Sequence, residues 1–179
     1  LPDTITSIGT GAFRDCEFLN HVKLPDGLKI LSPQAFRYCM NLEEVNLPDT
    51  VIRIGEEALR GTGIRDFRVP KGVLVIEFAT FADCSKLRNI MLPEGLLSIE
   101  GGSFESCYAL SSLTIPASVS NIGSSIFFFM EKPPLVAVIA GSYAEQYYKE
   151  NDLPYISMEA KQGVHIAAAD AWGNDKPIP

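Results

Sequence analysis

The sequence has few basic residues and no long apolar run. Its 179 residues hold 15 Lys and Arg against 22 Asp and Glu, so the net charge of −7 argues against a nucleic-acid-binding protein, which carries a basic face. The same acidity disfavours electrostatic attachment to anionic lipid. No apolar run approaches the ~20 residues of a membrane span; the most apolar stretches, such as residues 126–130, are far shorter. We therefore expect neither nucleic-acid binding nor membrane insertion.

Residues and motifs that carry catalysis are also scarce. The chain has two histidines, His21 and His165, which lie far apart in sequence. It contains no GxSxG elbow, no Walker loop, no GxGxxG, no HExxH and no calcium-binding loop. Adjacent carboxylates such as Glu43 and Glu44 indicate a solvated surface, because glycoside hydrolysis needs carboxylates placed across a cleft. We expect no enzyme activity, no cofactor and no metal site.

What the sequence does contain is a repeat of 22 or 23 residues. An aliphatic residue followed by Pro returns six times, and positions are numbered here by the count of residues after this Pro. Apolar residues return behind each Pro at positions three, six and eleven and, in most copies, at positions seventeen, twenty and twenty-two. The third copy is one residue short between Leu59 and Ile64, where Gly-Thr-Gly permits a tighter turn, and its positions after this gap are counted as if the missing residue were present. The repeating prolines are Pro2, Pro25, Pro48, Pro70, Pro93 and Pro116.

This period predicts an α/β solenoid of about six coils. One copy has too little apolar surface to fold alone but can stack on its neighbours. The apolar pair at positions twenty and twenty-two predicts a short strand in each coil, and these strands would form a parallel sheet at about 4.8 Å per coil. We expect the segment from position ten to position fourteen to form one or two helical turns on the opposite wall.

The first coil, LPDTITSIGTGAFRDCEFLNHVKLP, resembles the BspA-like class of leucine-rich repeats. In that class an aliphatic-Pro start, an Ile-Gly, an Ala-Phe, a Cys and a Leu recur at these offsets. The resemblance covers residues 1–138 and implies a right-handed stack of coils. Residues 139–158 resemble the short strand-helix-strand unit that caps such arrays. Residues 159–179 match nothing in the family and are expected to be a tail or linker.

The chain begins with Leu1 instead of Met, and no charged and then apolar leader stands at its start. We therefore expect it to be an excised or processed piece of a longer protein.

Four cysteines share position fourteen, and Met130 takes that position in the sixth coil. Residues at one position of a solenoid form a row along its axis, whereas zinc ligands must converge on one ion. A Met in the same row fits packing, because Cys also behaves as a small buried hydrophobe. We expect four buried and unreactive thiols, although neighbours one coil apart are close enough for a disulfide. The four are Cys16, Cys39, Cys84 and Cys107.

Positions that the repeat leaves free to vary are where ligand recognition is expected, because in a solenoid they align as long surfaces. Position twenty-one lies outward between two inward strand residues, and position nineteen lies beside it. A solvated face without a ligand is the alternative interpretation. The candidate ligand-binding residues are Lys23, Asn46, Arg68, Met91 and Thr114 at position twenty-one, with His21, Glu44 and Asp66 at position nineteen.

Position twelve, with Arg37 in the second coil, is expected to be an exposed wall. In the sixth coil Phe128 and Phe129 stand at positions twelve and thirteen. At least one of these rings should be covered, and the closing unit is the expected cover because terminal repeats need one.

The resemblance implies a non-catalytic recognition or adhesion module of a secreted or surface-displayed protein. Its partner would be an extracellular or host-surface protein, or a glycan, bound through the sheet face. Exposed aromatic residues would favour a glycan, and position twenty-one has none. The alternative is a structural spacer or stalk that presents another domain and has no ligand of its own.

Overall fold

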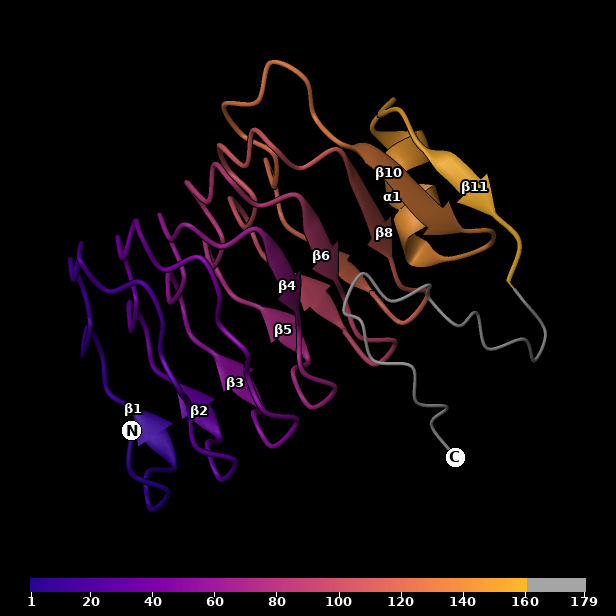
Figure 1. The fold of residues 1–179 in the computed structure, drawn as a ribbon. Coiled ribbons are helices and arrows are strands. Elements are labelled where there is room, and N and C mark those ends of the chain that lie inside the picture. Colours follow the sequence, from indigo (N-terminus) through magenta and orange to yellow (C-terminus); the bar gives the residue numbers. More distant parts are fainter. Residues whose placement is uncertain (161–179) are drawn as a thin grey trace, which may run out of the picture.

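The structure, a computed structural model, describes residues 1–160, and these form a β-solenoid with strands along two of its walls (Figure 1). Strands at positions five and six make the short-strand wall, and strands at positions nineteen to twenty-two make the sheet face. The short-strand wall contains β1 (Ser7–Ile8), β2 (Ile30–Leu31), β3 (Arg53–Ile54), β5 (Val75–Ile76), β7 (Ser98–Ile99) and β9 (Asn121–Ile122). The sheet face contains β4 (Asp66–Arg68), β6 (Asn89–Met91), β8 (Ser112–Ile115), β10 (Leu135–Ile139) and β11 (Ile156–Met158).

All strand pairs are parallel, and residues at equal positions lie opposite each other. Arg68 lies opposite Met91 in the β4–β6 pair, and Ile8 lies opposite Leu31 in the β1–β2 pair. The predicted solenoid and its strand at positions twenty to twenty-two are therefore confirmed from the third coil onward. In the first two coils this strand is reduced to one bridge, between His21 and Glu44. The short-strand wall was not predicted as a set of strands.

The expectation of helical turns between positions ten and fourteen is wrong. This segment, which we call the turn wall, consists of successive turns. In every coil the residues at positions nine and thirteen have φ between 51° and 67°, in the left-handed region. Two left-handed residues four apart cannot belong to a right-handed helix. They are Gly11 and Asp15, Gln34 and Tyr38, Glu57 and Gly61, Ala79 and Asp83, Gly102 and Ser106, and Ser125 and Phe129.

The reason for this conformation is a third set of hydrogen bonds between coils. In the first four coils, N–H groups at positions nine, eleven and thirteen of the turn wall donate to carbonyls of the next coil at positions eight, ten and twelve, and the fifth coil makes the last two of these bonds. Phe13 N donates to Ala35 O at 2.8 Å, and Tyr38 N donates to Arg60 O at 2.7 Å. The N–H groups of alternate residues therefore point along the solenoid axis, toward the next coil. In a helix they would donate to carbonyls of their own coil instead.

The core is a column of aromatic rings at position eleven. Phe13 stacks on Phe36 with ring centroids 5.1 Å apart, and Phe81 stacks on Phe104 at 5.7 Å. Leu59 interrupts the column in the third coil, where Phe67 approaches Phe81 edge-on at 5.1 Å. Aromatic pairs in such arrangements contribute about 0.5–1.5 kcal/mol beyond the area they bury.

The cysteine row is buried, with one exception. Cys39, Cys84 and Cys107 are fully buried, and each S–H donates to the position-eleven carbonyl of the preceding coil, at 2.9, 3.1 and 3.1 Å. Burial raises the pKa of the Cys39 and Cys84 thiols to about 11 and also raises that of Cys107. Cys16 is only half-buried, because the first coil has a neighbour on one side only; all four are free thiols.

Arg37 is not the exposed residue that was expected. Its Nη1 lies 2.7 Å from Oε2 of Glu57, and Nη1 of Arg60 lies 2.8 Å from Oε1 of the same carboxylate. Gln34 Nε2 also donates to Glu57, at 2.8 Å. The Glu57 side chain is 10% exposed, and those of Arg37 and Arg60 are 19% and 20% exposed. Burial opposes charge on Arg60, but its hydrogen bonds to Glu57 and to Asp83 outweigh this and raise its pKa.

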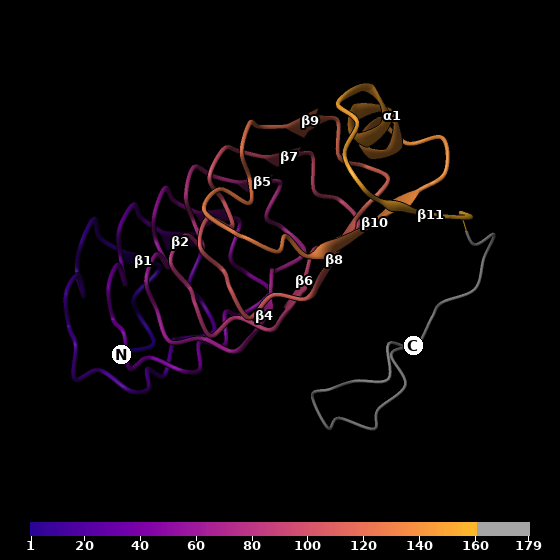
Figure 2. The ribbon, with the colours of Figure 1, turned by 90° about the horizontal axis from the view of Figure 1, so that it is seen from above.

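One helix, α1 (Tyr143–Glu150), closes the end of the solenoid (Figure 2). It begins at the N-cap Ser142, whose Oγ accepts from Glu145 N, and it packs against β9 and β10. The strand-helix-strand cap is therefore present as β10, α1 and β11. It lies on the two strand walls and leaves the end of the turn wall open, so Phe128 and Phe129 remain 50% and 64% exposed. The expected cover of these rings is wrong.

Replacing Phe81 with Ala should destabilise the protein by about 3–5 kcal/mol, because the ring lies between Phe67 and Phe104 and its loss leaves a cavity. Replacing Phe18, which is 94% exposed, with Ala should change stability by less than about 0.5 kcal/mol. Urea unfolding followed by circular dichroism measures both changes. Equal losses for the two variants would contradict the packing described here.

Replacing Glu57 with Gln should lower the free energy of unfolding by about 3 kcal/mol, because the largely buried Arg37 loses its counter-charge and Arg60 keeps only Asp83 and Glu105. The matched control is Glu43→Gln. Glu43 also binds two cations, Arg65 and Lys86, but in solvent, so little change is expected. Thermal unfolding of the two variants and of the native chain measures both changes. Equal losses of stability would show that the ion pairs of Glu57 are surface pairs like those of Glu43.

Maleimide labelling of the folded protein should modify Cys16 well before the other three thiols, because the other three are fully buried and hydrogen-bonded. In denaturant all four should react. Mass spectrometry of the time course gives the order of labelling. Early modification of Cys84 or Cys107 would show that the cysteine row does not face the core.

Candidate functional site

The sheet face carries the candidate ligand-binding residues on its outer side. All five side chains at position twenty-one are exposed to solvent; that of Met91, for example, is 41% exposed. The strand residues that flank them point inward, as the two-residue period of a strand requires. At position nineteen His21 and Glu44 are exposed, and Asp66 is half-buried. The structure therefore places the eight residues along one face, as a row and not as a cluster. The five are Lys23, Asn46, Arg68, Met91 and Thr114.

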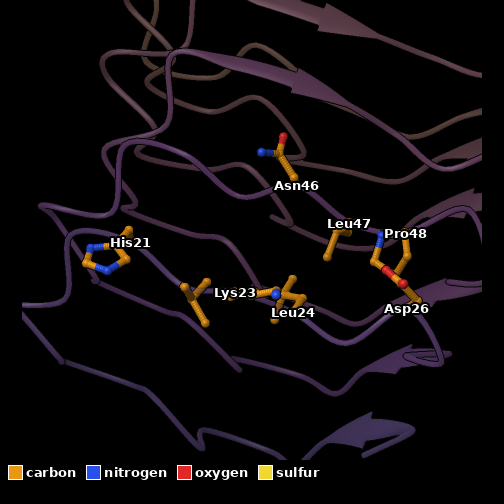
Figure 3. A pocket seen from close by; sticks show the side chains of 8 residues that line it. His21, Lys23, Leu24, Asp26, Asn46, Leu47 and Pro48 are labelled. Carbon is orange, nitrogen blue, oxygen red and sulfur yellow. The ribbon is translucent and has the colours of Figure 1, made fainter. Parts of the chain in front are cut away.

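Three of these residues border one shallow depression of about 460 Å³ at the N-terminal end of the sheet face (Figure 3). On the sheet face the first two coils are joined only by the bridge between His21 and Glu44. Residues 22–24 and 45–47 form no strand pair, unlike the residues of β4 and β6, and the depression opens between them. Its lining is His21, Val22, Lys23, Leu24, Asp26, Asn46, Leu47 and Pro48.

Several side chains of the sheet face already have partners within the chain. Arg68 Nη2 lies 2.7 Å from Oδ1 of Asp49, and Asn46 Nδ2 donates to Glu44 at 3.0 Å. Asn89 donates to Asp66 in the same way. Among the described residues Lys23 has no ion pair with a carboxylate, so its charge is available to a ligand.

The arrangement in the depression is not that of a catalytic site. His21 and Asp26 lie at its opposite ends, with Lys23 and Leu24 between them (Figure 3). His21 Nδ1 instead hydrogen-bonds to Oδ1 of its neighbour Asn20. A base and its orienting carboxylate must be within hydrogen-bond distance of each other. Within residues 1–160, no group of three His, Cys, Asp or Glu side chains is arranged to hold a metal ion.

A second depression, of about 510 Å³, lies at the short third coil, and sequence reasoning did not predict it. The missing residue brings the backbone at Gly61 and Gly63 close to Tyr38 and Met40 of the second coil. A Cβ at Gly61 would overlap the ring of Tyr38, and one at Gly63 would lie 2.5 Å from Met40 O. The one-residue gap in the repeat is the signal that could have located it. The lining is Tyr38, Met40, Asn41, Gly61, Thr62, Gly63, Asp83, Ser85 and Lys86.

Among the residues that the structure describes, no helix is long and apolar enough to cross a membrane.

Comparison with known proteins finds relatives of the repeat. A leucine rich cell surface protein of Faecalibacterium prausnitzii A2-165 has a similar structure, with a TM-score of 0.68 and 30% sequence identity. The similarity covers 76% of this chain and 37% of that protein, so the chain spans well under half of its length. A T. pallidum leucine rich repeat protein gives a TM-score of 0.46 and 23% identity over 89% of this chain and 71% of that one.

No curated protein matches the chain. The BspA type leucine rich repeat region, by contrast, matches residues 1–132 in six copies. These six copies are the coils built from the repeated Pro, Phe and Cys positions described above. The chain belongs to the BspA-type leucine-rich repeat family.

Proposed function

We propose that this chain is a non-catalytic recognition module of a surface-displayed or secreted protein and that it binds a partner through its sheet face. The observation that carries the proposal is the row at position twenty-one. Its five side chains are exposed, yet they differ in chemistry from coil to coil, from a cation to an amide, a thioether and a hydroxyl. The inward positions of the same strands stay aliphatic or aromatic, so only the outward row is free to specify a ligand.

The chemistry of the row favours a protein partner over a glycan. Arg and Met are enriched at the centres of protein interfaces, and Lys contributes charge at the rim. Stacking of sugar rings uses exposed aromatic side chains, and none stands at position twenty-one. The similar F. prausnitzii protein is a cell surface protein, which supports an extracellular location for this module.

A structural spacer is the second candidate, and one observation favours it. Arg68, Glu44 and Asp66 each have a partner within the chain already. A surface whose charges satisfy one another gains little from a further ligand. The two candidates differ in whether the outward side chains matter to any binding event.

The test is the triple variant Lys23→Ser, Arg68→Ser and Met91→Ser. We expect it to fold like the native chain, because none of the three belongs to the inward set, and to lose at least tenfold in affinity for a partner, about 1.4 kcal/mol. Binding is measured on an array of purified extracellular-matrix proteins and glycans. The matched control is Lys29→Ser, Lys71→Ser and Met40→Ser, which likewise removes two cations and one thioether from exposed positions outside this row.

Retained affinity in the control and lost affinity in the first variant would support recognition through the sheet face. Equal binding by both variants would overturn recognition through the sheet face, and no ligand for the native chain on the array would favour the spacer. Arg14, Arg37 and Arg60 do not serve as a control, because two of them bind Glu57 and their loss would disturb the fold.

A further inference from the structure

Strand β10 is apolar at every position, although only one of its faces meets the core. Its sequence, Leu-Val-Ala-Val-Ile, contains no polar residue from Leu135 to Ile139. Val136 and Val138 face inward and are 2% and 0% exposed. A parallel strand that is apolar on both sides is typical of a sheet that is covered on both faces. The outer face of β10 therefore has the composition of a covered surface.

Strand β11 extends this apolar outer face. Ile156 lies opposite Ala137 and Met158 lies opposite Ile139, so these side chains share the outward side. Leu135 is 52% exposed and Ile156 is 46% exposed. Helix α1 packs on the inner side, at the end of the core, and not on the outward side (Figure 2), where Ala137, Ile139 and Met158 are half-buried. We call the five outward residues the end patch: Leu135, Ala137, Ile139, Ile156 and Met158.

No charge interrupts the end patch. The neighbouring strand β8 adds Ser112 and Thr114 on the same side, and the charged pair of Arg68 with Asp49 lies further toward the N-terminal coils. The chain as a whole carries a net charge of −7, so two copies repel each other over most of their surface. An uncharged apolar patch is where two identical surfaces can meet without opposing like charges.

We propose that the end patch pairs with the end patch of a second copy of this chain. A two-fold pair uses the same surface on both partners, and a flat aliphatic sheet is complementary to itself. Two such sheets pack face to face about 10 Å apart, with their strands within about 30° of each other. In the pair the outer side of β10 becomes buried, as its sequence requires.

The size of the end patch predicts that the pair is weak. With strands about 4.8 Å apart and about 3.3 Å per residue, β8, β10 and β11 offer roughly 200 Å² of flat surface. Stable complexes bury about 800 Å² on each partner. The pair should therefore form at high protein concentration, or where many copies are held close together on a surface, because tethering raises the effective concentration.

The experiment is sedimentation equilibrium of the full chain from about 5 µM to about 1 mM, which spans weak dissociation constants. The native mass should rise from 19.6 kDa toward twice that value as the concentration increases. The double variant Leu135→Lys and Ile156→Lys should weaken association at least tenfold. The control Ile52→Lys and Leu74→Lys changes two other exposed aliphatic residues, on the short-strand side of the solenoid, and should associate as the native chain does.

Three outcomes would overturn the proposal. One is a native chain that stays monomeric throughout the range. Another is a loss of association in the Ile52 and Leu74 variant with none in the Leu135 and Ile156 variant. The third is a chain shortened at Ala160 that pairs when the full chain does not, since the remaining residues of the same chain would then be the occupant. Circular dichroism of each variant verifies that the fold is retained.

This inference is independent of the proposed function. The end patch shares no residue with Lys23, Arg68 or Met91, so the variant that tests recognition leaves the pairing surface intact. If the chain pairs but binds no ligand, the proposed function is refuted and the pairing stands. If it binds a ligand but does not pair, the pairing is refuted and the proposed function stands.

Discussion

Each coil of this protein can bury its apolar residues only against the coils beside it. The coils must therefore stack at one spacing on every wall, and three sets of hydrogen bonds maintain it: two strand ladders and the N–H to C=O bonds of the turn wall. The aromatic column and the cysteine S–H donors lie between these walls at the same spacing. A change in one coil is tolerated only if it preserves this stacking, and the short third coil does so through Gly61 and Gly63.

Stacking at equal positions also decides how charges meet. Residues about one repeat apart in sequence become neighbours in space, as residues three or four apart do on a helix. Arg53 with Glu77, Arg65 with Glu43, and Arg37 with Glu57 are all pairs of this kind. The same geometry spreads exposed residues into rows along the axis, so the solenoid offers extended surfaces. Shallow depressions occur where the pairing is incomplete or a coil is short.

The ends of the stack are where these rules change. Cys16 is half-buried in the first coil, while its equivalents further along are fully buried. At the other end, α1 closes the two strand walls but not the turn wall, where Phe128 and Phe129 are exposed. The apolar outer face of β10 and β11 belongs to this end as well. Recognition along the sheet face and pairing at its end are thus proposals for two different parts of one surface.

The sequence by itself determined the solenoid, the number of coils and which strand residues face outward. A repeat of about 23 residues sets the phase of every position, and a strand has a period of two, so Lys23 and Arg68 could be placed outward without a structure. The cysteine row followed from the same phase. The depth to which each cysteine is buried did not follow from the repeat, because it depends on whether its coil has one neighbouring coil or two.

Only the tertiary structure decided the turn wall and the partners of its side chains. Gln34, Tyr38 and Ala79 adopt left-handed φ values that their side chains disfavour, and bonds to the next coil, not local propensity, impose this conformation on them. Arg37 was expected to be exposed because it does not face the core of its own coil. Its ion-pair partner, Glu57, belongs to the next coil, so the pair could not be seen within one repeat. Local sequence carries the period of the repeat, whereas these features arise from contacts that exist only once the coils are stacked.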